Sequence, residues 1–190
     1  MDGSSANSRS AQRWPDVGCG HGASAIIMAQ AYPESTFIGY DAHGKLIEIA
    51  CQRAQEAGIK DRVKFEVAAA KDYPASGYSL ICFMGCLHDM GDPVGAAAHA
   101  LQALKLDGTV LLIEPYAGDR VEDNLNAVGR LYYAASTAIC TPCSCSQEVG
   151  LGLGAQADEA HLWEIMMAAG FSRYRCATQT PFNLVLEARP

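Results

Sequence analysis

The 190-residue chain lacks several features that would place it in a specialised class of protein. It has no apolar stretch long enough to cross a bilayer, and its first residues, MDGSSANSRSAQRW, lack the apolar middle of a signal peptide. Lysine and arginine total 14 against 21 aspartates and glutamates and form no run, which argues against a nucleic-acid groove. We therefore expect a cytoplasmic protein with no membrane partner and no nucleic-acid partner.

The cysteines do not suggest a disulfide framework or a metal centre. Most of the eight lie within apolar segments, where a thiol buries as a small hydrophobe, and reduced core thiols suit a cytosolic chain. The exception is CTPCSC, which holds Cys140, Cys143 and Cys145. A structural zinc site needs four ligands, and the nearest downstream histidine, His161, is far along the chain. We interpret these three as loop cysteines and predict no metal site.

The most informative stretch is PDVGCGHGASA, residues 15–25. Within it, GCGHGA matches the G-x-G-x-x-G/A pattern, in which glycines let backbone N–H groups approach a ligand without a Cβ in the way. Asp16 stands two residues before the first glycine of the pattern. A carboxylate there gives no advantage to a pyrophosphate but favours a cationic ligand, which argues against NAD.

Strand-like and helix-like segments alternate up to residue 115, which predicts an α/β fold on a parallel sheet. The predicted strands are 14–17, 36–41, 62–68, 78–84 and 108–115, and the predicted helices are 22–32, 44–58 and 93–105, with Gly58 and Gly108 at helix ends.

The pattern changes after residue 115, because residues 115–157 contain no strand. A helix is predicted over 122–139 and a long irregular loop over 140–156, and such loops are typical of lids. The chain then predicts a helix over 158–170 and two strands, 171–179 and 182–190, whose tight connection allows only antiparallel pairing. That pair is not expected in a doubly wound dinucleotide domain.

Asp41 ends the second predicted strand in GYD, where a carboxylate can accept both hydroxyls of a ribose. This feature supports a nucleoside ligand without choosing between NAD and an adenosyl compound.

The motifs DVGCGHG, GYD, LICFMGCLHDMGDP and GTVLLIEP together resemble a class I S-adenosylmethionine-dependent methyltransferase. The resemblance implies a Rossmann-like fold with a mostly parallel seven-stranded sheet and a C-terminal antiparallel pair. It implies a methyltransferase domain over 14–190 with 115–157 as a lid or substrate insertion, after a disordered polar tail at 1–13. CLHDMGDP followed by EPYAGDRVEDNLN resembles a bacterial small-molecule-type group. Its members often carry an N-terminal winged-helix-like domain, which we expect this chain to lack.

The resemblance also implies a set of residues for S-adenosyl-L-methionine. Gly18 and Gly20 would lie against its methionine part, with Asp16 near the ammonium end. Asp41 would hold the ribose. Where the family usually has an acidic residue for the adenine amino group, this chain has Ala69, so adenine would need a backbone contact or Asp72. The full implied set is Asp16, Gly18, Cys19, Gly20, Asp41, Ala42, Ala69, Met84 and Gly85, the last two near the sulfonium.

Methyl transfer from a sulfonium is an in-line displacement, in which the protein positions the reactants and excludes water. His88, just beyond the fourth strand, is a candidate general base for a hydroxyl acceptor, with Asp89 to orient it. A structural role, capping the following turn, is the alternative for this histidine. Glu114, at the end of the fifth strand, is a second candidate. The absence of an aromatic-flanked Pro-Pro signature favours O-, C- or S-methylation of a small molecule, with O-methylation as the leading expectation.

Two other functions stay open, and so does a homodimer. The chain could be a non-catalytic or truncated methyltransferase-like protein, or, more weakly supported, an NAD-dependent enzyme. Pro15 motivates the idea of truncation, because proline is tolerated in a central strand only at its start. We predict that the first strand begins at residue 15 or 16 and is frayed, in a shortened version of a longer methyltransferase.

Overall fold

Seven strands form one mixed sheet in the computed structural model, which describes residues 13–190. The strands are β1 (Arg13–Val17), β2 (Thr36–Asp41), β3 (Val63–Val67), β4 (Tyr78–Met84), β5 (Leu104–Pro115), β6 (Arg173–Gln179) and β7 (Asn183–Arg189). Their order across the sheet is β3-β2-β1-β4-β5-β7-β6, and only the pairs β5–β7 and β6–β7 are antiparallel. The predicted mostly parallel sheet with a C-terminal antiparallel pair is confirmed.

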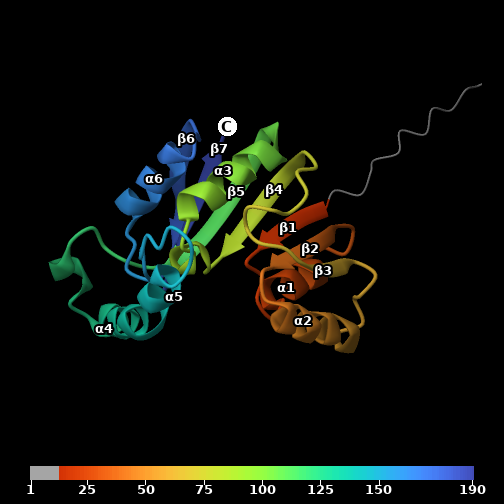
Figure 1. Cartoon of the computed structure of the whole chain (residues 1–190), viewed down its shortest axis with the longest axis horizontal. Coiled ribbons are helices and arrows are strands. Elements are labelled where there is room, and N and C mark those ends of the chain that lie inside the picture. Colours follow the sequence, from red (N-terminus) through yellow and green to blue (C-terminus); the bar gives the residue numbers. More distant parts are fainter. Residues whose placement is uncertain (1–12) are drawn as a thin grey trace, which may run out of the picture.

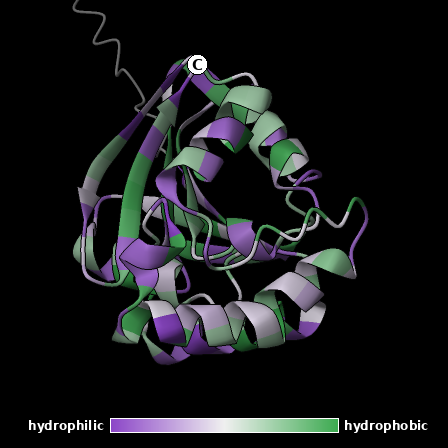
Figure 2. Ribbon diagram, turned by 90° about the vertical axis from the view of Figure 1, so that its left-hand side faces the viewer, coloured by the Kyte–Doolittle hydropathy of each residue, from purple (hydrophilic) through white to green (hydrophobic). Residues whose placement is uncertain are grey.

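Helices cover both faces of this sheet (Figure 1). The two on one face, beside β1 to β3, are α1 (Ala23–Ala31) and α2 (Gly44–Glu56), and the two beside β4 to β7 are α3 (Pro93–Ala103) and α6 (Glu159–Ala168). Each pair encloses its own apolar cluster against the sheet. Figure 2 shows the strands as largely hydrophobic, whereas hydrophilic residues recur along the helices. No helix within residues 13–190 has the length and apolar character that a membrane crossing requires.

The connection between β5 and α6 is more helical than the sequence suggests. It contains η2 (Val121–Asn124), α4 (Ala127–Ala135), a π-helical turn η3 (Ser136–Cys140) and α5 (Thr141–Cys145). The predicted irregular loop over 140–156 is therefore wrong in its first part. Pro142 closely follows the π-helical turn, and Cys140 before it already has helical angles, so the chain continues as one helical run through CTPCSC. We call residues 121–151 the lid.

The prediction that β1 starts at residue 15 or 16 is wrong. The strand starts at Arg13 and pairs with β2 along its whole length, from Arg13↔Thr36 to Val17↔Tyr40. Trp14 anchors this early start, because its ring packs edge-on against Phe37 at 5.4 Å. Only Asp16 and Val17 pair with β4. On the side facing β4, the strand is therefore unpaired from Arg13 to Pro15. Except for Arg13, the predicted polar tail lies outside the described residues.

The prediction that Gly108 ends a helix is also wrong. Leu104 is already extended and starts β5, and Gly108 lies within this strand near an irregularity in the pairing with β4. A Cβ at Gly108 would come within 2.9 Å of the carbonyl oxygen of Tyr78. The glycine thus permits the close approach of two strands rather than capping a helix.

Asp16 is a completely buried carboxyl group within β1. One of its oxygens, Oδ2, accepts a hydrogen bond from the Ser24 hydroxyl, whereas Oδ1 has no hydrogen-bond partner within residues 13–190. Burial raises the pKa of Asp16 to about 6, against the opposing effect of its hydrogen bonds to Ser24 and the Ala25 N–H. The folded protein therefore carries a carboxylate at neutral pH at a cost in stability.

Replacing this group tests that cost. Because the pKa is higher in the folded than in the unfolded chain, Asp16 stabilises the fold below about pH 4, and this contribution is lost as the pH rises to about 6. Asp16→Asn resembles the protonated form, so we expect it to be more stable than the parent at pH 7 by about 3 kcal/mol, the equivalent of a two-unit shift. Urea unfolding of both proteins at pH 7 and pH 4 measures this difference, which should nearly vanish at pH 4. An equal difference at both pH values would contradict the prediction.

Candidate functional site

The glycine loop between β1 and α1 is held by backbone hydrogen bonds to β2 and by the side chain of a residue that follows β4. Gly18, Gly20 and Gly22 all have positive φ angles, of 71°, 53° and 76°, which other residues rarely adopt. The N–H groups of Gly18 and Cys19 both donate to the carbonyl oxygen of Tyr40 in β2, at 2.8 and 3.0 Å. A Cβ on Gly18 would lie 2.8 Å from the Sγ of Cys86, which follows β4. The loop is therefore fixed at the carboxyl edge of the sheet.

Asp41, at the end of β2, joins the glycine loop to the start of α2. Its Oδ2 accepts from the Gly20 N–H and its Oδ1 from the His43 N–H, each at 2.9 Å. A carboxylate oxygen has two lone pairs, so each oxygen can accept one further hydrogen bond. The arrangement leaves Asp41 able to take two ligand hydroxyls while its orientation stays fixed.

A cavity of about 430 Å³ opens beside Asp41 at this edge of the sheet, within the size range of small-ligand sites. Its walls come from α3, from the lid, and from the residues that directly follow β2, β3 and β4, which we call the exits of these strands. Gly85, directly after β4, has a φ of 68°, and no atom lies within 4 Å of where its Cβ would be. Space therefore remains for a ligand to contact the backbone there.

The structure brings only part of the predicted cofactor set to this cavity. Gly18, Asp41, Ala42, Ala69 and Gly85 line it. Predicted residues that do not line it are Asp16, Cys19, Gly20, Met84, His88 and Glu114, and neither does Asp72. Three alanines, at 68, 69 and 70, form an apolar wall in place of an acidic side chain.

His88 and Glu114, predicted from different strands, form a buried pair behind the cavity. The imidazole Nδ1 contacts Glu114 Oε2, and the other carboxylate oxygen accepts from the N–H groups of Cys86 and Leu87, at 3.2 and 2.9 Å. Burial alone would lower the pKa of His88, but the hydrogen bond and charge of Glu114, with a contribution from Asp89, raise it above the usual value. Asp89, whose Oδ1 lies 3.3 Å from His88 Nε2, lines the cavity and connects the pair to it.

The lid contributes residues that the sequence analysis missed. Gln147 bridges to the β4 exit, accepting from the Gly91 N–H at 3.0 Å and donating to the Asp89 carbonyl at 2.9 Å. Lys71 and Asp92 form an ion pair of 2.9 Å beside the cavity, with Glu148 of the lid 3.7 Å from the lysine. These contacts join segments up to 77 residues apart in the chain, and no local pattern in the sequence signals them.

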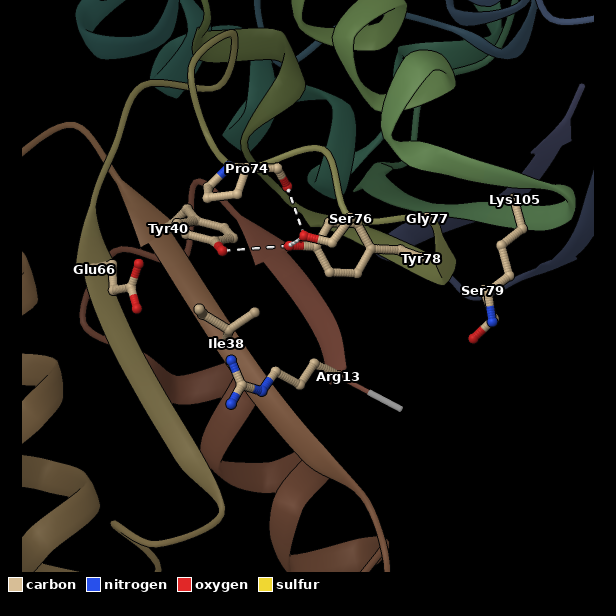
Figure 3. A pocket seen from close by; sticks show the side chains of 10 residues that line it. All are labelled: Arg13, Ile38, Tyr40, Glu66, Pro74, Ser76, Gly77, Tyr78, Ser79 and Lys105. Carbon is tan, nitrogen blue, oxygen red and sulfur yellow. Dashed lines mark hydrogen bonds between the residues drawn. The ribbon is translucent and has the colours of Figure 1, made fainter. Parts of the chain in front are cut away.

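A second cavity, of about 370 Å³, lies away from the glycine loop. Figure 3 shows Arg13 and Glu66 among the residues that line it, together with the Tyr40 and Tyr78 hydroxyls, which lie 3.4 Å apart. It exists because the segment between β3 and β4 has no helix to cover the sheet. It lacks the glycine backbone and Asp41, so the cavity beside Asp41 is the better candidate for a nucleoside.

Comparison with known proteins gives a consistent result. A family model described as a methyltransferase domain matches residues 9–168. An uncharacterized methyltransferase of Bacillus subtilis is 29% identical over 130 residues, which cover 66% of this chain and 50% of that protein. The 27-O-demethylrifamycin SV methyltransferase of Amycolatopsis mediterranei is 34% identical over 106 residues, covering 55% of this chain and 39% of that protein. The chain thus spans half or less of the length of these curated relatives.

A solved structure agrees in fold. An O-methyltransferase from neocarzinostatin biosynthesis, in complex with S-adenosyl-L-homocysteine and 1,4-dihydroxy-2-naphthoic acid, superposes with a TM-score of 0.70 at 22% identity, covering 94% of this chain and 49% of that one. Because the family model matches most of its length, the chain belongs to the methyltransferase-domain family.

Proposed function

We propose that the protein is an S-adenosylmethionine-dependent methyltransferase that O-methylates a small-molecule acceptor by in-line displacement. The observation that carries this proposal is the Asp41 carboxylate, held by two backbone N–H groups beside a glycine loop and a cavity of about 430 Å³. The relatives that are named as methyltransferases support the same reaction class.

The residues around the cavity suit an adenosyl sulfonium compound. Asp41 would accept the ribose hydroxyls, and Ala42 and Ala69 would lie against the flat, apolar adenine. Gly18 and Gly85 line the cavity, and at Gly85 open space next to the backbone would receive the methionine part. Asp16, buried behind the loop, would contribute its charge through the protein rather than by contact, because it does not line the cavity. The bound cofactor would supply the activated methyl group.

His88 would act as the general base toward the acceptor hydroxyl. Glu114 fixes the imidazole by its contact with Nδ1, so Nε2 faces Asp89 and the cavity side. In its neutral form, Nε2 can take the hydroxyl proton as the oxygen attacks the methyl carbon. Because Glu114 raises the pKa of His88, the base becomes fully active only above the usual histidine range.

A cytoplasmic location belongs to the same proposal. All eight cysteines are free thiols in the described structure, which suits a reducing compartment.

Calorimetry tests the cofactor assignment. We expect the parent protein to bind S-adenosylmethionine and S-adenosylhomocysteine but not NAD. Asp41→Ala removes two charge-assisted hydrogen bonds to the ribose and should weaken binding of both adenosyl ligands by roughly 100-fold or more. Asp72→Ala, a matched change of an exposed carboxylate outside the cavity, should leave affinity unchanged.

Each other outcome has a defined meaning. A folded sample that gives no heat with either adenosyl ligand rejects the proposal, and heat with NAD alone would favour the dehydrogenase alternative. Loss of affinity in Asp72→Ala would return that residue to an adenine-binding role.

The role of Glu114 can be tested without knowing the acceptor. Glu114→Gln removes the charge and the hydrogen bond that raise the pKa of His88, so we expect this pKa to fall. NMR titration of the imidazole signals measures it, with the other four histidines as internal references. With an acceptor in hand, the acidic limb of the rate profile should move to lower pH by the same amount. An unchanged His88 titration would show that Glu114 does not control the base.

A further inference from the structure

Cys140 of the lid lies against the residues that follow β4. Its Sγ, one ring nitrogen of His88 and one carboxylate oxygen of Asp89 all lie within 4.8 Å of one another. The lid segment that brings Cys140 there is the π-helical turn η3, whereas His88 and Asp89 belong to η1 (Leu87–Asp89). Cys140 and His88 are both buried, at 7% and 5% exposure, whereas Asp89 reaches the cavity.

Two of these three groups already have the spacing of ligands in a tetrahedral metal site. Two ligand atoms of tetrahedral zinc with bonds of about 2.0–2.1 Å lie about 3.3 Å apart. His88 Nε2 and Asp89 Oδ1 are 3.3 Å apart. Asp89 Oδ1 is buried and has no hydrogen-bond partner within residues 13–190. Its polar neighbours are the imidazole of His88 and the thiol of Cys140, and a cation placed between the three groups would satisfy all of them.

A second carboxylate orients the histidine ligand. Glu114 contacts Nδ1 of His88 and is itself held by two backbone N–H groups, so Nε2 is left toward Asp89. A carboxylate on the far nitrogen of a ligating histidine is the usual outer shell of zinc sites.

We propose that His88, Asp89 and Cys140 bind one zinc ion, or a similar thiol-binding divalent cation, with a fourth position open toward the cavity. On binding, the Cys140 sulfur–hydrogen bond is replaced by a sulfur–metal bond, and the proton leaves to the solvent. The ion ties the lid to the β4 exit. It also occupies Nε2, so a metal-loaded protein has lost its base, and this consequence alone rests on the proposed function.

This site is not a zinc site formed by the three cysteines of the CTPCSC motif. Cys143 and Cys145 are exposed, and His161 pairs with Asp158 at 2.8 Å. Within residues 13–190, the cluster around His88 is the only group of three metal-ligating side chains with closely spaced ligand atoms. Only the first cysteine of the motif contributes to it.

Titration with Co²⁺ and Cd²⁺ tests the site on the full chain, reduced and without cofactor or acceptor. We expect one equivalent to bind with the visible bands of four-coordinate Co²⁺ and the ultraviolet charge-transfer band of a metal–thiolate bond. Cys140→Ser should abolish that thiolate band and weaken binding at least tenfold. Cys145→Ser, a change of an exposed cysteine in the same lid, should alter neither.

Two further variants keep the test decisive if Cys140→Ser folds poorly. Asp89→Asn removes a ligand on a partly exposed side chain, and Glu114→Gln should weaken binding by about 10- to 100-fold through the outer shell. The proposal fails if no metal binds, if the thiolate band survives in Cys140→Ser, or if it disappears in Cys145→Ser. Because neither cofactor nor acceptor is present, these results are independent of those that test the methyltransferase function.

Discussion

The buried carboxylate of Glu114 is the constraint on which the site depends. It is fully inaccessible to solvent at the end of β5, and it accepts hydrogen bonds from Cys86 N–H, Leu87 N–H and the His88 ring. These donors fix the chain where it leaves β4. Cys86 in turn donates its thiol to the Val17 carbonyl at 3.0 Å, so the same contact positions the glycine loop. One carboxylate thus fixes the position of the candidate base and of the β4 exit, and through Cys86 that of the glycine loop.

The lid takes its position from the same segment. Gln147, Ser144 and Leu151 all bond to the backbone between Asp89 and Gly91, and Gly91 has no room for a Cβ beside Gln147. The lid therefore docks mainly on the residues that follow those held by Glu114, and makes a further contact from the Tyr132 hydroxyl to the Phe182 carbonyl, between β6 and β7, at 2.9 Å. A change at Glu114 would therefore alter both the pKa of His88 and the position of the segment on which the lid docks. The Glu114→Gln variant tests both effects.

The sequence predicted the elements whose causes are local and missed those whose causes are distant. The strand and helix order and the position of Asp41 at the end of a strand follow from nearby residues. The early start of β1 depends on Trp14 packing against Phe37, 23 positions later, and the lid depends on contacts across more than 50 residues. Cys140 is the clearest case, because its neighbours His88 and Asp89 belong to another element. The spacing of the cysteines within CTPCSC therefore could not predict this contact.

The two buried acids at this edge of the sheet differ in a way that points to function. Glu114 has a partner for each oxygen, whereas Asp16 leaves Oδ1 without one and has its pKa raised to about 6 by burial. A protein selected only for stability would replace such a group by an amide or an apolar residue, since an unsatisfied buried charge is costly. The charge is useful behind a loop that receives a cation, because the cation lowers the pKa of the carboxyl group and recovers part of that cost on binding. Under the proposed function, Asp16 would therefore destabilise the empty protein more than the cofactor-loaded protein, so that cofactor binding would be coupled to the stability of β1.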